Sequence, residues 1–318
     1  MPDLHAPPVE IGSPVVTEST PPEARRREGR AVVPERGGEV RTVEMFDTTP
    51  AVNRREDIIT AGNSTFRFLR MARILLDPGA DRYAPISVQV GGDEEALFYV
   101  NRGEATVEAG GEVYPLTRGD VLYVGLGEAV TVRAEAGVAD VSEFRAVQCS
   151  TKYPVQLVRH ADLEGTDLAA NVGTKRPMTR RTVYKLVDRN VQACRLLFGD
   201  TYGAQPGAVG SYPPHFHGPD GPHGLGENAK EEIYHFRVES TIPGDAAYVL
   251  QNCARPEERV NTYVHVFDEQ AINVTPSFHD TIAPPAIRFM FTWCLGAFKE
   301  GHRDWAEVFN KPGYENEW

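Results

Sequence analysis

Four side chains in the second half of the chain have the types and spacing of a metal site. His215 and His217 stand two residues apart in SYPPHFH, and Glu232 begins the apolar run that follows. Side chains two apart on a β-strand point to the same side, so both imidazoles face one space. His279, in VTPSFHDT, is a fourth candidate. Three imidazoles and one carboxylate held by strands are typical of a divalent-metal site with positions left open for substrate oxygens.

The alternative for each histidine is a structural role, which is the usual role of a single histidine in a β-rich protein. A His-x-His pair followed by a glutamate before an apolar run favours the metal site. His235 falls on the opposite strand face from Glu232 by parity, so it is left out of the ligand set. His223 lies in a loop rich in Gly and Pro, where it is a lid residue or a bystander, and we favour the bystander.

Composition limits the classes of function. The 318 residues are 41% hydrophobic and 25% charged, which is typical of a soluble globular protein of one or two domains. A net charge of −12 argues against nucleic acid or a membrane surface as the main partner. It leaves room for an anionic small molecule, because one or two arginines can bind a carboxylate. The four cysteines form no Cys-x-x-Cys pair, and neither a leader nor a run of 18 apolar residues occurs; we therefore expect a reduced, cytoplasmic protein.

The pattern of short apolar runs predicts an all-β protein with two similar halves. Runs such as ALFYV, ATVEA and VLYVG alternate with turns that contain Gly and Asp, and a second series runs from RTVYKLV to IRFMFTWCLG. Such spacing is typical of a sandwich or small barrel. We expect a disordered arm rich in Pro, Glu and Arg, a first barrel, a connector, a second barrel and a tail, over residues 1–45, 46–150, 151–178, 179–300 and 301–318.

The two halves differ in their histidines. GDVLYVGLGEA in the first half aligns with EQAINVTPSFH in the second, and Ala129 then takes the place of His279. No histidine occurs between His5 and His160. If the halves are a structural duplication, only the second barrel can hold a metal through imidazoles.

Together these stretches resemble the bicupin isomerases of deoxyuronates. The resemblance covers about Phe66 to Phe298 and is carried by NRGEATVEAGGEVYPLTRGDVLYVG, TRRTVYKLV, SYPPHFH, EEIYHF, DEQAINVTPSFH and FMFTW. It implies two tandem jelly-roll (cupin) barrels that assemble as a homo-oligomer, a dimer or a hexamer. It also implies a divalent metal, generally zinc, with manganese or iron as alternatives, held by His215, His217, Glu232 and His279.

The activity that the resemblance implies is ketol-isomerisation of a sugar acid such as 5-deoxy-glucuronate or 5-dehydro-4-deoxy-glucuronate. A metal bound to the carbonyl and hydroxyl oxygens would stabilise the enediolate, while a base moves the proton between the two carbons. Candidates for the base are Glu232, Tyr234, Tyr248 and a metal-bound hydroxide, and the sequence does not rank them.

A uronate also needs a partner for its carboxylate. Arg181, in TRRTVYKLV, is the first candidate, because its planar guanidinium can bind a carboxylate through two parallel hydrogen bonds. Arg288 and Arg237 are alternatives.

Two other functions fit the same ligand set. Two-barrel cupins also use iron or nickel for dioxygen chemistry, and others bind or store sugars without catalysis. Family-like stretches in the metal-free half argue against the dioxygenase, and the complete His and Glu set argues against a binding protein that needs no metal.

Overall fold

The computed structural model describes residues 30–34, 40–218, 224–255, 260–275, 277–314 and 316–317. These residues form 23 strands and three short 3-10 helices, His160–Leu163, Pro177–Thr179 and Gly226–Asn228, and no α-helix. Within this part of the chain, no helix has the length and apolar character needed to cross a membrane.

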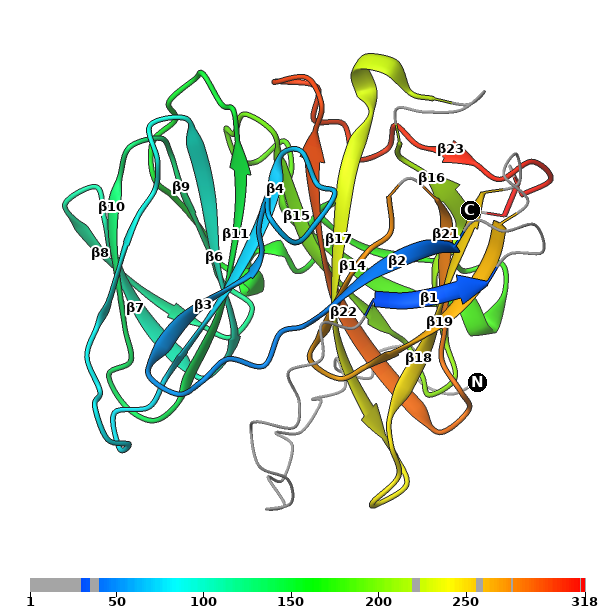
Figure 1. The fold of residues 1–318 in the computed structure, drawn as a ribbon, viewed down its shortest axis with the longest axis horizontal. Helices are drawn as coiled ribbons and strands as arrows, with labels where there is room; N and C mark the ends of the chain where they lie inside the picture. Colours follow the sequence, from blue (N-terminus) through cyan, green and yellow to red (C-terminus); the bar gives the residue numbers. More distant parts are fainter. Residues whose placement is uncertain are drawn as a thin grey trace.

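The N-terminal barrel consists of a six-stranded and a four-stranded sheet, on the left of Figure 1. The first has the order β12-β9-β6-β11-β4-β3 and the second β5-β10-β7-β8. The bounds are β3 Arg54–Ile59, β4 Leu69–Leu76, β5 Ile86–Gln89, β6 Glu94–Arg102, β7 Glu104–Ala109, β8 Glu112–Thr117, β9 Val121–Val124, β10 Ala129–Arg133, β11 Ala139–Val147 and β12 Gln156–Val158. Alternate residues of both sheets, among them Phe98, Val107 and Val132, fill the space between them.

The C-terminal barrel consists of an eight-stranded sheet, β1-β2-β20-β17-β22-β15-β14-β13, and a five-stranded sheet, β19-β18-β21-β16-β23. The bounds are β1 Arg30–Pro34, β2 Val40–Asp47, β13 Ala169–Val172, β14 Arg181–Val187, β15 Leu196–Gly203, β16 Val209–Phe216, β17 Lys230–Ser240, β18 Tyr248–Arg255, β19 Val260–Phe267, β20 Gln270–Asn273, β21 Phe278–Ile282, β22 Ile287–Ala297 and β23 Phe309–Asn310.

The two barrels repeat one strand order. β9-β6-β11-β4-β3 in the first corresponds to β20-β17-β22-β15-β14 in the second, and β5-β10-β7-β8 corresponds to β16-β21-β18-β19. The predicted fold class, two tandem cupin barrels built only from strands, is therefore confirmed.

The structure differs from the predicted boundaries at the start of the second barrel's large sheet. β2 pairs with β20 through Met45 and Ile272, and Val43 and Met45 pack against the apolar core of the C-terminal barrel. The predicted disordered arm thus ends in a strand that precedes the first barrel but belongs to the second. The segment VRTVEMF alternates apolar and polar residues as a strand does. The prediction of disorder rested on the Pro, Glu and Arg content of the whole arm, which hides this short pattern. Residues 1–29 and 35–39 of the predicted arm lie outside the described residues.

The predicted connector and tail also contribute strands. β12 joins the N-terminal barrel and β13 joins the C-terminal one, so the connector is divided between the two. β23, in the predicted tail, adds to the five-stranded sheet beside β16.

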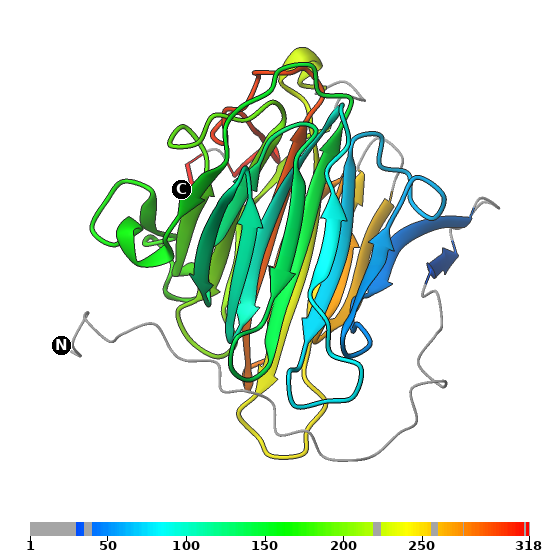
Figure 2. The same cartoon turned by 90° about the vertical axis from the view of Figure 1, so that its left-hand side faces the viewer.

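The two large sheets pack against each other and form one apolar interface. Figure 2 shows the N-terminal barrel in front of the C-terminal one. Phe198 of β15 contacts Tyr99 of β6 and Phe144 of β11, with ring centroids 5.1 Å apart in each case. β17, which bears Glu232, belongs to the sheet at this interface.

Two buried carboxylates fasten the barrels to each other reciprocally. Glu231 of β17 accepts hydrogen bonds from the backbone N–H groups of residues 67–69, at 2.5, 2.9 and 3.1 Å. Glu95 of β6 accepts them from the N–H groups of residues 194–196, at 2.7, 2.7 and 2.8 Å. Each glutamate lies at the start of its strand and binds the start of a strand in the other barrel, so the strand that carries the predicted ligand Glu232 is tied to the N-terminal barrel.

Replacing Glu231 tests this attachment. In Glu231→Ala the N–H groups of residues 67–69 lose their acceptor, and two of these hydrogen bonds are fully buried. Since an unsatisfied buried donor costs about 1–3 kcal/mol, we expect the free energy of unfolding in urea to fall by at least about 2 kcal/mol. Glu104→Ala, at an exposed position of β7, should change it by less than about 0.5 kcal/mol. Equal losses in the two variants would contradict the proposed role.

Candidate metal centre

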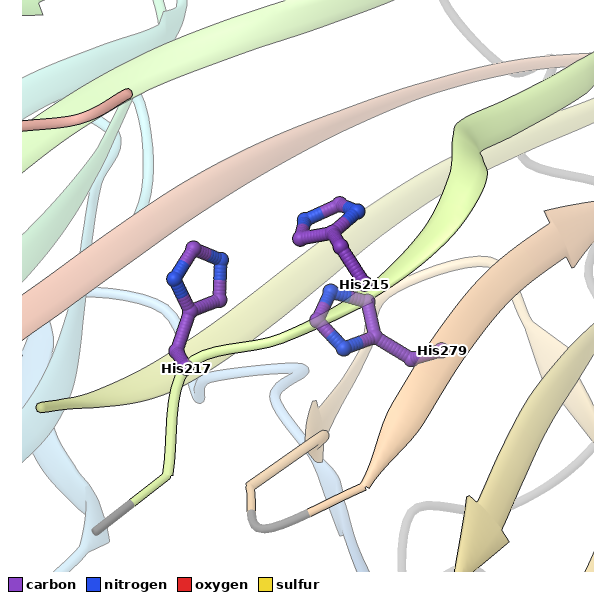
Figure 3. Close-up of side chains that lie close together, drawn as sticks. All are labelled: His215, His217 and His279. Carbon is purple, nitrogen blue, oxygen red and sulfur yellow. The ribbon is translucent and has the colours of Figure 1, made fainter. Parts of the chain in front are cut away.

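Three buried histidines meet between the sheets of the C-terminal barrel, as Figure 3 shows. His215 lies near the end of β16, His217 directly follows that strand, and His279 lies on β21. One ring nitrogen of each lies within 4.8 Å of the others. His215 and His279 are cross-strand partners and so point to the same side. Their pairing resumes after an irregularity that begins at Gly210 and spans Pro213 and Pro214, which cannot donate to the ladder.

Glu232 reaches the same point from the opposite sheet. Its Oε2 lies 3.4 Å from His217 Nε2 and 3.2 Å from His279 Nε2. This oxygen is buried and accepts no hydrogen bond from the described residues. Burial raises the pKa of Glu232 to about 8. All four predicted ligands therefore gather in one place, and Glu231 points the other way, into the barrel interface.

The imidazoles are held in the neutral form that binds metals. His215 Nδ1 lies 2.9 Å from the Pro213 carbonyl, and His279 Nδ1 lies 3.0 Å from the Ser277 carbonyl. Because a carbonyl can only accept, both Nδ1 atoms carry the hydrogen and Nε2 keeps its lone pair. Burial lowers the pKa of His215 to about 3 and that of His279 to about 4, and it lowers the pKa of His217 well below its usual value.

This set of donors fits a divalent ion. Three neutral nitrogens and one carboxylate oxygen are ligands that zinc, manganese and iron accept. In addition, Glu232 Oε2 lies close to the lone pair of His279 Nε2 in a buried site, at 3.2 Å. Such an arrangement is unfavourable unless a cation or a proton lies among them.

Three of these side chains, His215, His217 and Glu232, border a cavity of about 330 Å³. Its other polar lining residues include Arg181, Ser211, Tyr234 and Asn310, and its apolar walls are formed by Val183, Phe291, Trp293, Trp305, Ala306 and Val308. A cavity of this size with a few polar groups on apolar walls suits a small ligand.

Tyr234 connects the cavity to the histidine cluster. It follows Glu232 by two positions on β17 and so faces the same side. Its hydroxyl lies 2.9 Å from His279 Nε2 and 2.8 Å from Ser211 Oγ. Burial, followed by the nearby Glu232 carboxylate, raises the pKa of Tyr234 well above its usual value, so the phenol stays protonated at neutral pH. The hydroxyl can hold or pass a proton at the edge of the centre.

Arg181 places a buried positive charge on the cavity wall. Its side chain donates to the carbonyls of Thr179 and Tyr212, at 2.9 and 2.7 Å. Among the described residues no carboxylate forms an ion pair with it. Burial lowers the pKa of Arg181 to about 10, which leaves it charged at neutral pH. A buried guanidinium with only carbonyl partners is suited to binding an anionic ligand.

The structure does not bring Tyr248, Arg288 or Arg237 to the cavity. The Tyr248 ring lies at the start of β18 against the ring of His265, with centroids 4.9 Å apart. Arg288 alternates with Phe289 and Phe291, which face the barrel core, and so points to the other side of β22. Arg237 forms ion pairs with Asp140 and Glu269, at 3.6 and 3.0 Å, at the barrel interface.

His235 also faces away from the centre, as strand parity predicts. Its Nε2 lies 2.9 Å from Arg73 Nη1 and from Thr48 Oγ1 in the barrel interface. His223, the bystander of the sequence analysis, lies outside the described residues.

Several cavity residues that the sequence did not predict lie in the tail, and others, Val183, Thr201 and Ser211, lie on strands of the C-terminal barrel. Trp305, Ala306, Val308 and Asn310 line the cavity, and Asn310 pairs with His215 across β23 and β16. β23 has two residues, too few to produce an alternating pattern. The only signal in the sequence was the mixture of Trp, Phe and Asn in a segment otherwise rich in charge.

Comparison with known proteins identifies the family of the chain. Residues 59–316 match the KduI/IolB family. The 4-deoxy-L-threo-5-hexosulose-uronate ketol-isomerase of Agrobacterium fabrum is 31% identical over 224 residues, which cover 70% of this chain and 72% of that protein. The enzyme of the same name from Escherichia coli O127:H6 is 25% identical over 254 residues, or 74% and 83% of the two chains.

A solved structure agrees in fold. The IolB-like protein of Salmonella typhimurium LT2 superposes with a TM-score of 0.69 at 16% identity, over 85% of this chain and 97% of that one. At this identity the likeness concerns the fold alone, whereas the sequence relatives extend it to the reaction class. The chain belongs to the KduI/IolB family and is an enzyme, a ketol-isomerase.

Proposed function

We propose that the chain is a metal-dependent isomerase of a deoxyuronate, such as 5-deoxy-glucuronate or 5-dehydro-4-deoxy-glucuronate. The observation that carries the proposal is the buried cluster of three histidines and Glu232 beside a cavity whose wall bears the unpaired charge of Arg181. The cluster of histidines and Glu232 is suited to binding a cation, and Arg181 is suited to binding the carboxylate of an acid. The names of the relatives support a uronate as substrate.

The metal in this proposal is zinc, with manganese or iron as alternatives, and its ligands are His215, His217, Glu232 and His279. When bound, such an ion supplies Lewis-acid activation of a carbonyl and needs no redox chemistry. The ordered Nδ1 hydrogen bonds of His215 and His279 fix the rings so that Nε2 faces the centre.

The protein's own groups then bind the acid and move the proton. Arg181 binds the carboxylate and so fixes which carbons of the sugar lie next to the cluster. Tyr234, still protonated and hydrogen-bonded to Ser211, acts as the acid that donates a proton to the substrate oxygen that becomes a hydroxyl. The carbon-bound proton is taken by a separate base, for which Glu232 is the candidate that lines the cavity. The apolar walls formed by Phe291, Trp293 and Trp305 keep water away from the reactive carbanion.

We also propose that the protein is cytoplasmic and assembles as a homo-oligomer, either a dimer or a hexamer. Tyr263 and Phe267 support an association surface, since both are exposed on β19, which forms one edge of the five-stranded sheet.

The direct test is an isomerisation assay under nitrogen. Protein purified without chelators is incubated in heavy water with a panel of uronic acids that includes the two deoxyuronates. We expect an isomeric product that carries solvent deuterium at one carbon. Tyr234→Phe should lower kcat by about 10²- to 10⁴-fold, because it removes the proton-transfer group, whereas Tyr248→Phe should not. A strict requirement for oxygen, or no product from any acid, would contradict the proposal.

Metal binding is tested separately by comparing two histidines. His215→Ala removes one of the proposed ligands. Mutation of a residue that only supports a ligand lowers metal affinity by about 10- to 100-fold, so we expect the metal affinity of this variant to fall by more than that. Elemental analysis should find about one ion per wild-type chain and almost none in the variant. His265→Ala, exposed on β19, should keep the ion. Circular dichroism should show strands in both variants; full metal occupancy in His215→Ala would remove that residue from the ligand set.

The role of Arg181 is tested against Arg288, one of the two alternative carboxylate ligands predicted from the sequence. Arg181→Met removes the charge from the cavity, and loss of one partner of a buried charge pair costs about 2–5 kcal/mol. We therefore expect kcat/KM for the acid to fall by at least about 30-fold, and inhibition by simple carboxylates to weaken in parallel. Arg288→Met should behave as the wild type, because its side chain points away from the cavity. The reverse order of effects would reassign the carboxylate site.

A further inference from the structure

The tail strand lies directly against the strand that bears the His-x-His pair. β23 pairs antiparallel with β16, with Asn310 opposite His215 and Phe309 opposite Phe216. The N–H of Lys311 donates to the Pro214 carbonyl at 2.9 Å and continues this pairing. Cross-strand partners point to the same side, so the Asn310 side chain lies on the face from which His215 enters the centre.

Asn310 presents an unused acceptor to the cavity. The residue lines the cavity, and its Oδ1 is buried and accepts no hydrogen bond from the described residues. Buried amide oxygens are almost always hydrogen-bonded in folded proteins, so this atom needs a partner. A hydroxyl of a bound ligand can supply one.

Asn310 differs from the other polar side chains of the cavity that lie outside the proposed ligand set. Arg181 carries only donors, and the Ser211 and Tyr234 hydroxyls bond each other. Of these described side chains, only Asn310 has a buried oxygen without a hydrogen-bond partner. A neutral amide oxygen of this kind selects a hydroxyl over a second carboxylate.

The tail is fixed before any ligand binds. The Arg303 guanidinium donates to the carbonyls of Leu196, Val191 and Asp188, at 2.7, 3.1 and 3.1 Å. The Trp305 ring lies 6.3 Å from the Trp293 ring and 4.2 Å from Lys185 Nζ. Arg303 and Trp305 anchor the segment before Asn310 and the Lys311 N–H bond anchors it after, so Asn310 can discriminate between ligands without reordering the chain.

We propose that Asn310 is a specificity-determining residue that accepts a hydrogen bond from a substrate hydroxyl next to the histidine cluster. The ligand is then a hydroxylated sugar acid held at two points, its carboxylate by Arg181 and one hydroxyl by Asn310. The inference rests on the proposed function and deepens it, because it assigns part of the substrate selection to the tail.

The test measures one variant against a series of ligands. Asn310→Ala and wild type, both metal-loaded, are compared on the accepted uronate and on analogues that each lack one hydroxyl. We expect kcat/KM and the calorimetric affinity for the parent acid to fall by about 10- to 100-fold in the variant. For the analogue without the partner hydroxyl, variant and wild type should be equal. Metal content per chain should not change. Lys311→Ala, the next residue of the tail with its side chain on the opposite face, should match the wild type.

The outcomes separate this inference from the proposed function. If wild type binds the acids without turnover, the isomerase proposal fails and Asn310 is judged by the affinities alone. If the loss in Asn310→Ala is the same for every analogue, is no larger than in Lys311→Ala, or accompanies loss of metal, the residue is structural and the inference is overturned. If wild type neither binds nor converts any acid, both fail.

Discussion

The alternation of side chains along β17 links the barrel interface to the chemistry. Glu231 points out of the C-terminal barrel and binds three N–H groups of the N-terminal one, while the adjacent Glu232 points inward to the histidines. A shift of this strand by one residue would exchange the two carboxylates and lose both interactions. The register that joins the barrels is therefore the register that completes the candidate metal centre, although the N-terminal barrel contributes no residue to the histidine cluster.

The duplication shows what each barrel has retained. Leu97 of β6 faces Tyr123 of β9 as Ile233 of β17 faces Asn273 of β20, so Glu95 corresponds to Glu231 and Ala96 to Glu232. Both barrels thus have the interface carboxylate, whereas the first has alanine at the position of the inward glutamate. Ala129, which the sequence aligns with His279, is exposed on β10, and the inward residues of that strand are the apolar Val130 and Val132. We infer that the N-terminal barrel serves as a rigid support whose interior is filled by apolar side chains such as Phe98 and Val107.

Sequence reasoning succeeded where a local period determines the geometry. The common direction of His215 and His217 and the exclusion of His235 follow from the two-residue repeat of a strand. The preference for Glu232 comes from its place directly before the Ile-Tyr pair, which the family resemblance supplies. Tyr248 and Arg288 depend instead on which end and which face of a strand borders the cavity, and this is decided by contacts between segments distant in the chain. β2 and β23 join the sheet of a barrel that lies elsewhere in the sequence. Asn310 could be recognised only once its strand was seen beside β16.

The charges of the cavity define the kind of ligand that it accepts. Burial raises the pKa of Glu232 and lowers that of Arg181, so the charged form of each residue is disfavoured when it is alone. The two cannot neutralise each other directly, because Arg181 bonds carbonyl groups and Glu232 lies among imidazoles. A cation at the histidine cluster relieves the first charge, and a carboxylate relieves the second. A neutral sugar would leave the guanidinium with carbonyl partners only, and without a metal Glu232 would have to hold a proton to relieve its contact with His279. The proposed function therefore implies that an acidic sugar and a divalent ion bind cooperatively, because each compensates a different buried group.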